Sequence, residues 1–374
     1  MCGVNFMDFK SDQSTKINNE NKLLILCART RLTSSIKHEI TQLIKNGLDW
    51  DYLMKTSSRH KLDPLIYSNL NSINSEYIEL KVMDKFKALY NLNIHKNLLY
   101  LGELFAILKI LKSENICAIP YKGPVLAATA YGNLGLREFV DIDIFVSKKD
   151  IIKTRQVLIS NGYEINKQIK GFKEKIYINT QRDYQFYNPT NDINIEIHWN
   201  FIGMSFTYPS DLFSNPKNLK NIKINNRNVL SLSSEDMLII LCIHASGHLW
   251  ERLSWICDIS EFIQNEYINW QCLIEKCEKL GFKRILQINI KLAIDILGLK
   301  LSEQTINEIQ MDNYQVKKIC KDIKENLLNF PDKDNGIIYT SLMRKNIREK
   351  RTDQIQDFFK VIFSNLVFQL YSIF

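Results

Sequence analysis

Hydrophobic residues recur at three- and four-residue spacing through the first third of the chain. The segments KLLILCARTRL, SIKHEITQLIKNGLDWDYLMKTSSRHK and KVMDKFKALYNLNIHKNLLYLGELFAILKILKS follow this spacing, and glycine and proline are nearly absent from them. The spacing matches the period of an α-helix. It therefore predicts an N-terminal helical region over residues 22–113, preceded by a polar tail, 1–21, that we expect to be disordered.

The pattern changes near residue 115, where short apolar runs are separated by glycine and proline. NICAIPYKGP predicts a short strand that ends at Gly123 and Pro124, and VLAATAYGN predicts a helix. REFVDIDIFV predicts a strand and KKDIIKTRQVLISNGY a helix, after which EINKQI, KIYIN, YQFYN and INIEIHWN each predict a strand. Residues 114–230 should therefore form a small α/β or α+β core with a mostly antiparallel tail.

Helical spacing returns at Ser233. SSEDMLIILCIHASGHLWERLSWICDISEFIQN begins with serines followed by acidic residues, which is typical of a helix N-terminus. Further helices are predicted to the C-terminus, interrupted by PDKDNG at 331–336, and the apolar stretch 358–374 is predicted to be a docked terminal helix. The predicted fold class is thus α+β, with a small mixed sheet between the N-terminal helical region and a C-terminal helical domain, 231–374.

The composition is that of an ordinary globular protein. Apolar residues make up 45% and charged residues 24% of the 374 residues, a length that suggests two or three domains. The net charge of +8 is compatible with a phosphate-bearing partner but does not require one. None of the eight cysteines forms a C-x-x-C pair, and the polar N-terminus has no signal-peptide core, so we expect a cytoplasmic protein without a zinc knuckle.

The C-terminal apolar stretch is too short and too polar for a transmembrane helix, which needs about 20 apolar residues. A basic run precedes it, between residues 344 and 351. Because of this run, peripheral membrane contact stays open as a minority interpretation.

Two aspartates interrupt the apolar strand REFVDIDIFV. Alternate side chains of a strand point to opposite faces, which puts Asp141 and Asp143 on one face and Ile142 and Ile144 on the other. Two carboxylates so close repel one another and lose hydration when buried. A divalent cation between them removes both costs, and Mg²⁺ prefers oxygen ligands. The same D-x-D spacing at 332–334 lies in a polar loop, where it predicts only a solvated turn.

A second alternating strand lies downstream. In INIEIHWN, Asn194, Glu196 and His198 share one face, opposite Ile195 and Ile197. If this strand is a neighbour of the first, Glu196 can approach the aspartate pair. Three carboxylates on two strands suit a two-metal site for in-line phosphoryl transfer, with the metals about 3.5–4 Å apart. The sequence therefore predicts a site for two Mg²⁺ ions, in which Mn²⁺ can substitute.

These motifs resemble those of a known group of enzymes. A strand, a glycine turn, a helix and a strand bearing D-x-D, with a third carboxylate on a later strand, is the layout of the DNA polymerase β-like nucleotidyltransferase superfamily. More closely, YKGPVLAATAYGNLGLREFVDIDIFV is similar to the K-G, L, Y, G, R, D-I-D pattern of an uncharacterised nucleotidyltransferase family, whose bacterial members often sit in biosynthetic or capsule gene neighbourhoods. IEIHW and HASGHLWERLSWICDI are similar too, so the resemblance covers most of residues 22–300.

The resemblance implies roles for several residues. Asp141 and Asp143 would bind two Mg²⁺ ions, and Glu196 would complete one metal site and help to deprotonate the attacking hydroxyl. Lys122 and Gly123 occupy the turn where many superfamily members have Gly-Ser, so Lys122 would contact a phosphate as a point charge.

Arg137 is a second candidate for contact with the triphosphate, because it lies four residues before Asp141. The alternative interpretation is that Arg137 forms an ion pair at the protein surface.

A polar stripe is predicted on one face of a helix over HASGHLWERLSWICDI. Helical spacing aligns His244, His248, Arg252, Trp255 and Asp258. Zinc binding is disfavoured, because Ala245 follows His244 and breaks the H-E-x-x-H pattern. Two interpretations remain: the stripe lines the nucleotide or acceptor pocket, or it forms a buried hydrogen-bonded network that ties the helical domain to the core. His198 has the same two interpretations.

Together these features predict a Mg²⁺-dependent nucleotidyltransferase. It would transfer an NMP group from an NTP, with ATP the expected nucleotide, to a hydroxyl-type acceptor on a small molecule, peptide or glycan precursor, and release pyrophosphate. Two alternatives stay open. One is a toxin-like enzyme that acts on tRNA or another RNA, which the net charge favours weakly. The other is a non-catalytic nucleotide-binding scaffold, against which three costly carboxylates argue.

Overall fold

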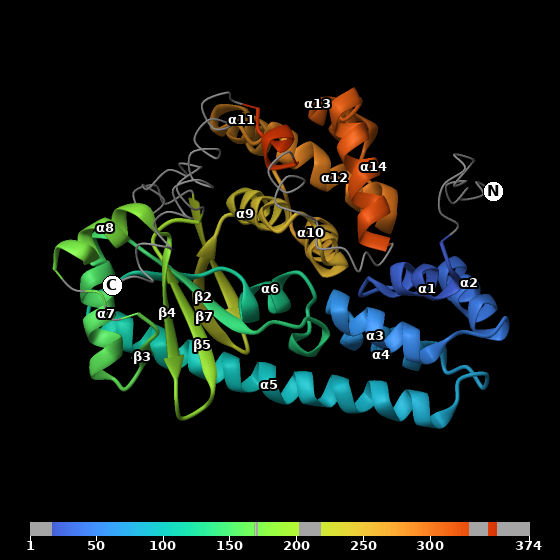
Figure 1. The fold of residues 1–374 in the computed structure, drawn as a ribbon, viewed down its shortest axis with the longest axis horizontal. Coiled ribbons are helices and arrows are strands. Elements are labelled where there is room, and N and C mark those ends of the chain that lie inside the picture. Colours follow the sequence, from blue (N-terminus) through green and yellow to red (C-terminus); the bar gives the residue numbers. More distant parts are fainter. Residues whose placement is uncertain (1–16, 168, 170, 202–217, 329–342, 350–374) are drawn as a thin grey trace, which may run out of the picture.

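The computed structural model describes residues 17–167, 169, 171–201, 218–328 and 343–349. Over these residues the fold is α+β, and it follows the predicted order of helices, a small mixed core and further helices (Figure 1). The predicted turn at 331–336, the predicted helix at 358–374 and most of the predicted tail at 1–21 lie outside the described residues.

Five helices open the fold, and the fifth reaches the sheet. They are α1 (Asn19–Cys27), α2 (Ser34–Lys45), α3 (Trp50–His60), α4 (Asp63–Ile73) and α5 (Leu80–Ser113). Helix α5 runs the length of the lower side of the molecule in Figure 1, from the N-terminal helices to the sheet, where it contacts β1 and β2.

Polar residues buried on α5 hold the segment that leads into β2. The side-chain amides of Asn93 and Asn97 donate to the backbone carbonyl of Arg137 at 3.2 and 2.8 Å. The Tyr100 hydroxyl donates to the carbonyl of Val140 at 2.9 Å. Because buried carbonyls need partners, these bonds fix the course of the chain just before Asp141.

The sheet has five strands in the order β1-β2-β5-β4-β3. The strands are β1 (Ala118–Pro120), β2 (Asp141–Val146), β3 (Glu164–Ile165), β4 (Asp183–Asn188) and β5 (Ile193–His198). Strands β2 and β5 are parallel, and the other neighbouring pairs are antiparallel. A separate hairpin, β6 (Leu219–Ile224) and β7 (Arg227–Leu232), contacts β1 through β7.

Three helices and two 3-10 turns connect these strands. They are α6 (Gly123–Thr129), α7 (Ile151–Ser160) and α8 (Phe172–Thr180), with turns at Leu134–Leu136 and Lys148–Asp150. The prediction of a strand at KIYIN is wrong, because this segment belongs to α8. Glu174 and Ile178 lie about one helical turn apart in α8, and both are buried. Glu174 pairs with Arg155 at 2.9 Å, and the Ile178 carbonyl accepts the Trp199 indole at 2.9 Å, so tertiary bonds select the helix.

The named helices that follow the hairpin within the described residues are α9 (Ser234–Gly247), α10 (Leu253–Asn265), α11 (Trp270–Leu280), α12 (Lys283–Leu297), α13 (Glu303–Ile309) and α14 (Tyr314–Leu328), and residues 343–347 are also helical. Helix α9 begins at a Ser233 cap, as predicted, whose hydroxyl accepts from the Asp236 amide at 3.2 Å. The helix predicted to continue through HASGHLWERLSW is interrupted, so that prediction is wrong.

The interruption is explained by Trp250. Leu249 and Trp250 both adopt left-handed backbone angles, with φ of 51° and 52°. Trp250 is completely buried, and its indole donates to the Asn289 side chain on α12 at 2.7 Å. Burial of a large aromatic side chain with its N–H satisfied compensates for two strained residues.

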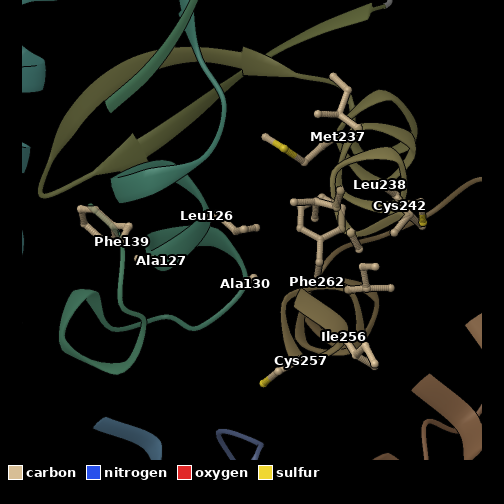
Figure 2. Close-up of a cluster of buried hydrophobic side chains, with 14 of the residues drawn as sticks. Leu126, Ala127, Ala130, Phe139, Met237, Leu238, Cys242, Ile256, Cys257 and Phe262 are labelled. Carbon is tan, nitrogen blue, oxygen red and sulfur yellow. The ribbon is translucent and has the colours of Figure 1, made fainter. Parts of the chain in front are cut away.

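The core joins the sheet unit to the C-terminal helices. Leu126, Ala127 and Ala130, in and just after α6, face Leu238 on α9 and Phe262 on α10 (Figure 2). Helix α9 buries apolar residues on nearly all sides, as expected for a helix inside a protein. Among the described residues, we find no helix with the length and apolarity needed to cross a membrane.

Candidate functional site

Parallel pairing of β2 and β5 brings the predicted carboxylates together. The register sets Asp143 opposite Glu196 and Asp141 opposite Asn194. Partners in register share a face of the sheet, so Asp141, Asp143 and Glu196 lie on one face. Ile142 and Ile195 fill the other face and are completely buried. The predicted approach of Glu196 to the aspartate pair is therefore present in the structure.

The two aspartates differ in their surroundings. Asp143 is 2% exposed, whereas Asp141, at the start of the strand, is half-buried. Burial and repulsion from Asp143 raise the pKa of Asp141 to about 6. The two acids share a face of the sheet but differ in their access to solvent.

Three side chains bind one oxygen of Asp143. The Lys122 ammonium lies 2.8 Å from Asp143 Oδ1, the His198 Nε2 atom lies 3.1 Å away, and the Tyr121 hydroxyl donates to it at 3.3 Å. Burial opposes ionisation of Asp143, but Lys122 and His198 outweigh it and hold the pKa of the carboxyl well below its usual range. Asp143 is therefore an anion at neutral pH.

His198 bridges the two strands' carboxylates. Its Nε2 atom lies 3.1 Å from Asp143 Oδ1 and 3.2 Å from Glu196 Oε2. The hydrogen bond from His198 is the main cause that lowers the pKa of Glu196. Burial disfavours the imidazolium, but the bonds to both carboxylates dominate and raise the pKa of His198. One imidazole thus sets the separation of Asp143 and Glu196.

These residues fit a divalent cation. Asp143, Glu196 and His198 each offer a ligand atom, and these atoms lie within 4.8 Å of one another. The second oxygen of Asp143 is buried and has no hydrogen-bond partner within the part of the chain that the structure describes. A buried carboxylate oxygen without a donor is a natural cation ligand. Asp141 lies outside this set of three but close enough to repel Asp143.

The turn formed by Lys122 and Gly123 lies next to the strand that carries Asp141 and Asp143. Gly123 has φ +48°, and a Cβ there would approach the Asp141 carbonyl to 3.1 Å. Glycine is needed because both the backbone angle and the space exclude a side chain. The turn directs Lys122 to Asp143.

Arg137 and Asp258 contact each other in the interior. Arg137 Nε lies 2.8 Å from Asp258 Oδ1, Arg137 Nη2 lies 2.9 Å from Oδ2, and the Tyr131 hydroxyl donates to Oδ1 at 2.7 Å. The pair links the entry of β2 to α10. For Asp258 the structure thus contains the buried network that the sequence left as one alternative for the stripe, and the ion pair that Arg137 forms with it lies in the interior and not at the surface.

The rest of the predicted stripe forms an aromatic group and not a helix face. The His244 and His248 ring centroids are 4.8 Å apart, and those of His248 and Trp255 are 4.9 Å apart. Arg252, just before α10, lies over the Trp255 ring at 5.4 Å. We name His244, His248 and Trp255 the aromatic group.

Four cations from separate parts of the chain surround His248. Partial desolvation and then the positive charges of Arg182, Lys122, Arg252 and Arg344, in that order, together lower the pKa of His248 to about 4. The same electrostatics reach His244, whose pKa is depressed by burial, Lys122 and His248. A positive region therefore borders the acidic residues. We name Lys122, Arg182, Arg252 and Arg344 the cationic group.

Tyr121, Arg182, Asp183 and Arg344 also lie at this site, although no sequence pattern had assigned them to it. Asp183 lies opposite His198 in the β4–β5 register, with its Oδ2 3.9 Å from His198 Nδ1, and Arg182 binds Asp183 at 2.9 Å. The alternation Asp183, Gln185, Tyr187 could have marked β4 as a third strand with a polar face. No local pattern marks Arg344, since only the tertiary fold brings it near His248.

A sheet that pairs a D-x-D strand in parallel with a second carboxylate strand is a nucleotidyltransferase core. The model of the uncharacterised nucleotidyltransferase family matches residues 46–298, and the chain belongs to that family. Nucleotidyl transfer is the activity class that this family supports, which implies an NTP, an acceptor and a divalent metal.

Comparison with solved structures and with curated proteins adds little about the function of this chain. The solution structure of the antibiotic-resistance factor ANT(2'')-Ia is 11% identical over 53% of this chain and 90% of that chain, with a TM-score of 0.31. No curated protein is similar enough to count as a match.

Proposed function

We propose that this protein transfers an NMP group from a Mg²⁺-bound NTP, with ATP the expected nucleotide, to a hydroxyl group of an acceptor. The observation that carries the proposal is the position of Asp143 opposite Glu196 on parallel strands, with His198 Nε2 within 3.2 Å of both carboxylates. Asp141, Asp143 and Glu196 would hold the two Mg²⁺ ions. Bound Mg²⁺ supplies charge neutralisation at the phosphates and polarises the reacting phosphoryl group.

The cationic group would receive the triphosphate. Its four residues all act electrostatically on His248, and Lys122 also contacts the carboxylate of Asp143, near which the α-phosphate must lie to react. Lys122 contacts Asp143 at 2.8 Å and would exchange part of that contact for a phosphate oxygen. The aromatic group would stack on the base, because neutral imidazole and indole rings offer apolar faces. His244 and His248 suit this role, since both pKa values are lowered.

Arg137 and Asp258 would act on the nucleotide site indirectly. Their buried ion pair holds the segment before β2 against α10, and α10 carries Trp255 of the aromatic group. The pair would thus hold the carboxylates of β2 at a fixed position relative to the aromatic group.

Glu196 would take the proton of the attacking hydroxyl. The acceptor oxygen forms a bond to the α-phosphorus, the bond from that phosphorus to the oxygen bridging to the β-phosphate breaks, and pyrophosphate leaves with the electron pair. The acceptor proton goes to the Glu196 carboxylate. This carboxylate is ionised at neutral pH because the His198 bond lowers its pKa, and His198 keeps it oriented.

The test follows radiolabel from α-labelled ATP into an acceptor fraction with Mg²⁺ present. Glu196→Gln should lower transfer by about 10²–10⁴-fold, the usual range for a lost general base. Asp141→Asn, at a half-buried position, should abolish metal-dependent transfer while the melting temperature stays close to wild type. Asp51→Asn, on an exposed acid of α3, is the matched control. Undiminished transfer by Asp141→Asn or Glu196→Gln would overturn the proposal.

A further inference from the structure

A cavity of about 350 Å³ lies beside β3 and β4, at the end of the sheet opposite β1. Its lining comes from β3, β4, the end of α8 and the residues between them, and includes Thr180, Gln181, Arg182, Asp183 and Gln185. Among the residues proposed above for the nucleotide and the metal ions, only Arg182 also lines this cavity.

The cavity adjoins the proposed general base. Gln185 lies directly opposite Glu196 in the β4–β5 register, as Asp183 does with His198. The row from Asp143 through Glu196 to Gln185 therefore runs along one face of the sheet, from a buried to a half-buried to an exposed position. A molecule held against Gln185 has its nearest carboxylate in Glu196.

Strand β3 ends beside the cavity. It pairs with Phe186 and Tyr187 of β4, and the Asn166 backbone N–H then donates to the Gln185 carbonyl at 3.1 Å. Beyond this bond, Asp183 and Tyr184 have no strand beside them on that side within the described residues, and the cavity lies there.

The two sides of the carboxylates differ in charge. The cationic group on one side brings four positive charges toward His248. The charged residues in the cavity lining are Lys167, Arg182 and Asp183, and Arg182 is paired with Asp183 at 2.9 Å. Such a lining lacks the excess of cations that a triphosphate requires, so the cavity suits the other substrate.

The remaining groups of the lining recognise hydroxyls. Asn166, Gln181 and Gln185 offer amides that both donate and accept, Thr180 offers a hydroxyl, and Asp183 beside Arg182 offers an acceptor next to a donor fork. The half-buried Tyr177 ring adds an apolar surface, stacked on Tyr184 at 5.2 Å. Paired donors and acceptors beside an aromatic ring suit a compact molecule with several hydroxyl groups. The volume is at the lower end of small-ligand pockets, which span about 300–1,000 Å³.

We propose that the cavity beside β4 is the acceptor site, and that the acceptor is a small polyhydroxylated, sugar-like molecule. Gln185 positions a hydroxyl of this acceptor beside Glu196, and Asp183 accepts a hydrogen bond from a neighbouring hydroxyl. This inference rests on the proposed nucleotidyl transfer and adds the acceptor class and its residues.

The experiment uses the full chain with α-labelled ATP, Mg²⁺ and a panel of single probes: free hexoses, hexosamines, amino acids, a short serine-containing peptide and a short RNA. Label should enter a hexose or hexosamine with saturation. Gln185→Leu should raise the KM for that sugar by at least tenfold and leave the KM for ATP within twofold. Gln181→Leu, also exposed in the lining, should raise the sugar KM in the same direction.

Gln304→Leu, on an exposed glutamine of α13 far along the chain from the cavity, should change neither KM. Transfer to a sugar with an unchanged sugar KM in both cavity variants overturns the acceptor site while the proposed function stands. Transfer only to the peptide, amino acids or RNA overturns the sugar-like class, as does ATP binding by calorimetry without transfer to, or binding of, any sugar. Failure of the wild type to bind ATP with Mg²⁺ overturns both proposals.

Discussion

Arg137 and Asp258, which lie 121 positions apart in the sequence, form a two-pronged ion pair in the protein interior with contacts of 2.8 and 2.9 Å. Burial disfavours the guanidinium charge, but Asp258 outweighs this effect and raises the pKa of Arg137 above its ordinary value. The pair therefore stays ionised and joins α10 to the segment that enters β2.

Removing Arg137 alone should be more harmful than removing both partners. Arg137→Met leaves Asp258 buried without its countercharge and should lower the free energy of unfolding by about 3–5 kcal/mol. Arg137→Met with Asp258→Leu should lose clearly less, because no buried charge is then left unpaired. Chemical denaturation measures both. Lys81→Met, which breaks the exposed pair with Glu79, is the control and should have little effect. Equal losses in the single and double variants would contradict this account.

Lys122 competes with a divalent cation for Asp143. Its ammonium lies 2.8 Å from Asp143 Oδ1, so Lys122→Gln removes a positive charge from the proposed metal site. Mn²⁺ should then bind roughly tenfold more tightly, which corresponds to about 1.4 kcal/mol. Electron paramagnetic resonance of free Mn²⁺ measures this without any turnover. ATP should bind more weakly to the same variant, because a phosphate contact is lost.

The matched control for the metal experiment is Lys148→Gln, whose ammonium contacts Asn179 at an exposed position. It should leave the Mn²⁺ affinity unchanged. If Lys122→Gln behaves like this control, Asp143 is not a ligand of the bound ion.

Variants of Arg344 and of its neighbour Lys345 distinguish a specific contribution of Arg344 to ATP binding from general attraction by the basic segment. Both are exposed cations, but only Arg344 acts on His248 within the cationic group. Arg344→Gln should raise the KM for ATP about three- to tenfold with kcat nearly unchanged, since binding of the ground state and of the transition state weakens alike. Lys345→Gln should leave the KM for ATP close to wild type. A similar rise in both variants would indicate only general attraction by the basic segment.

His60 makes the stability of the fold depend on pH. It is buried on α3, and its Nδ1 accepts the backbone N–H of Leu253 at 3.1 Å, where α10 begins. Burial, with Arg59 and Arg252, lowers its pKa to about 4 from an ordinary 6.5. Below pH 6.5 the unfolded chain therefore binds a proton that the folded chain rejects, so this contribution to stability falls as the pH drops from 6.5 to 4.

The expected loss from His60 by pH 4 is about 3 kcal/mol, from the size of the pKa difference. His60→Asn keeps an acceptor for Leu253 but does not titrate, so its free energy of unfolding should vary less over this window. Denaturation curves at several pH values measure the difference. Parallel pH profiles for the two proteins would show that His60 stays accessible to protons in the folded state.

Local pattern was sufficient to predict most of the elements. Three- and four-residue spacing predicted α1, α2, α3 and α5, and alternation predicted β2 and β5. It failed at KIYIN, where apolar residues at alternate positions fit a strand as well as one turn of a helix. It failed again after Gly247, where helical spacing continues although the chain turns. In both places a partner far away in the sequence determines the local structure. The Trp199 indole donates to the Ile178 carbonyl, and the Asn289 side chain accepts a hydrogen bond from the Trp250 indole.

For the site, the sequence by itself determined which side chains share a face within each strand, because alternation is a property of the backbone alone. Asp141 with Asp143, and Glu196 with His198, were grouped correctly for this reason. Only the tertiary structure decided that these strands are parallel neighbours, that Arg137 turns to Asp258, and that Arg182 and Arg344 come close to His248. Those choices depend on the packing and charge of residues far apart in the sequence, whose contacts no local period encodes.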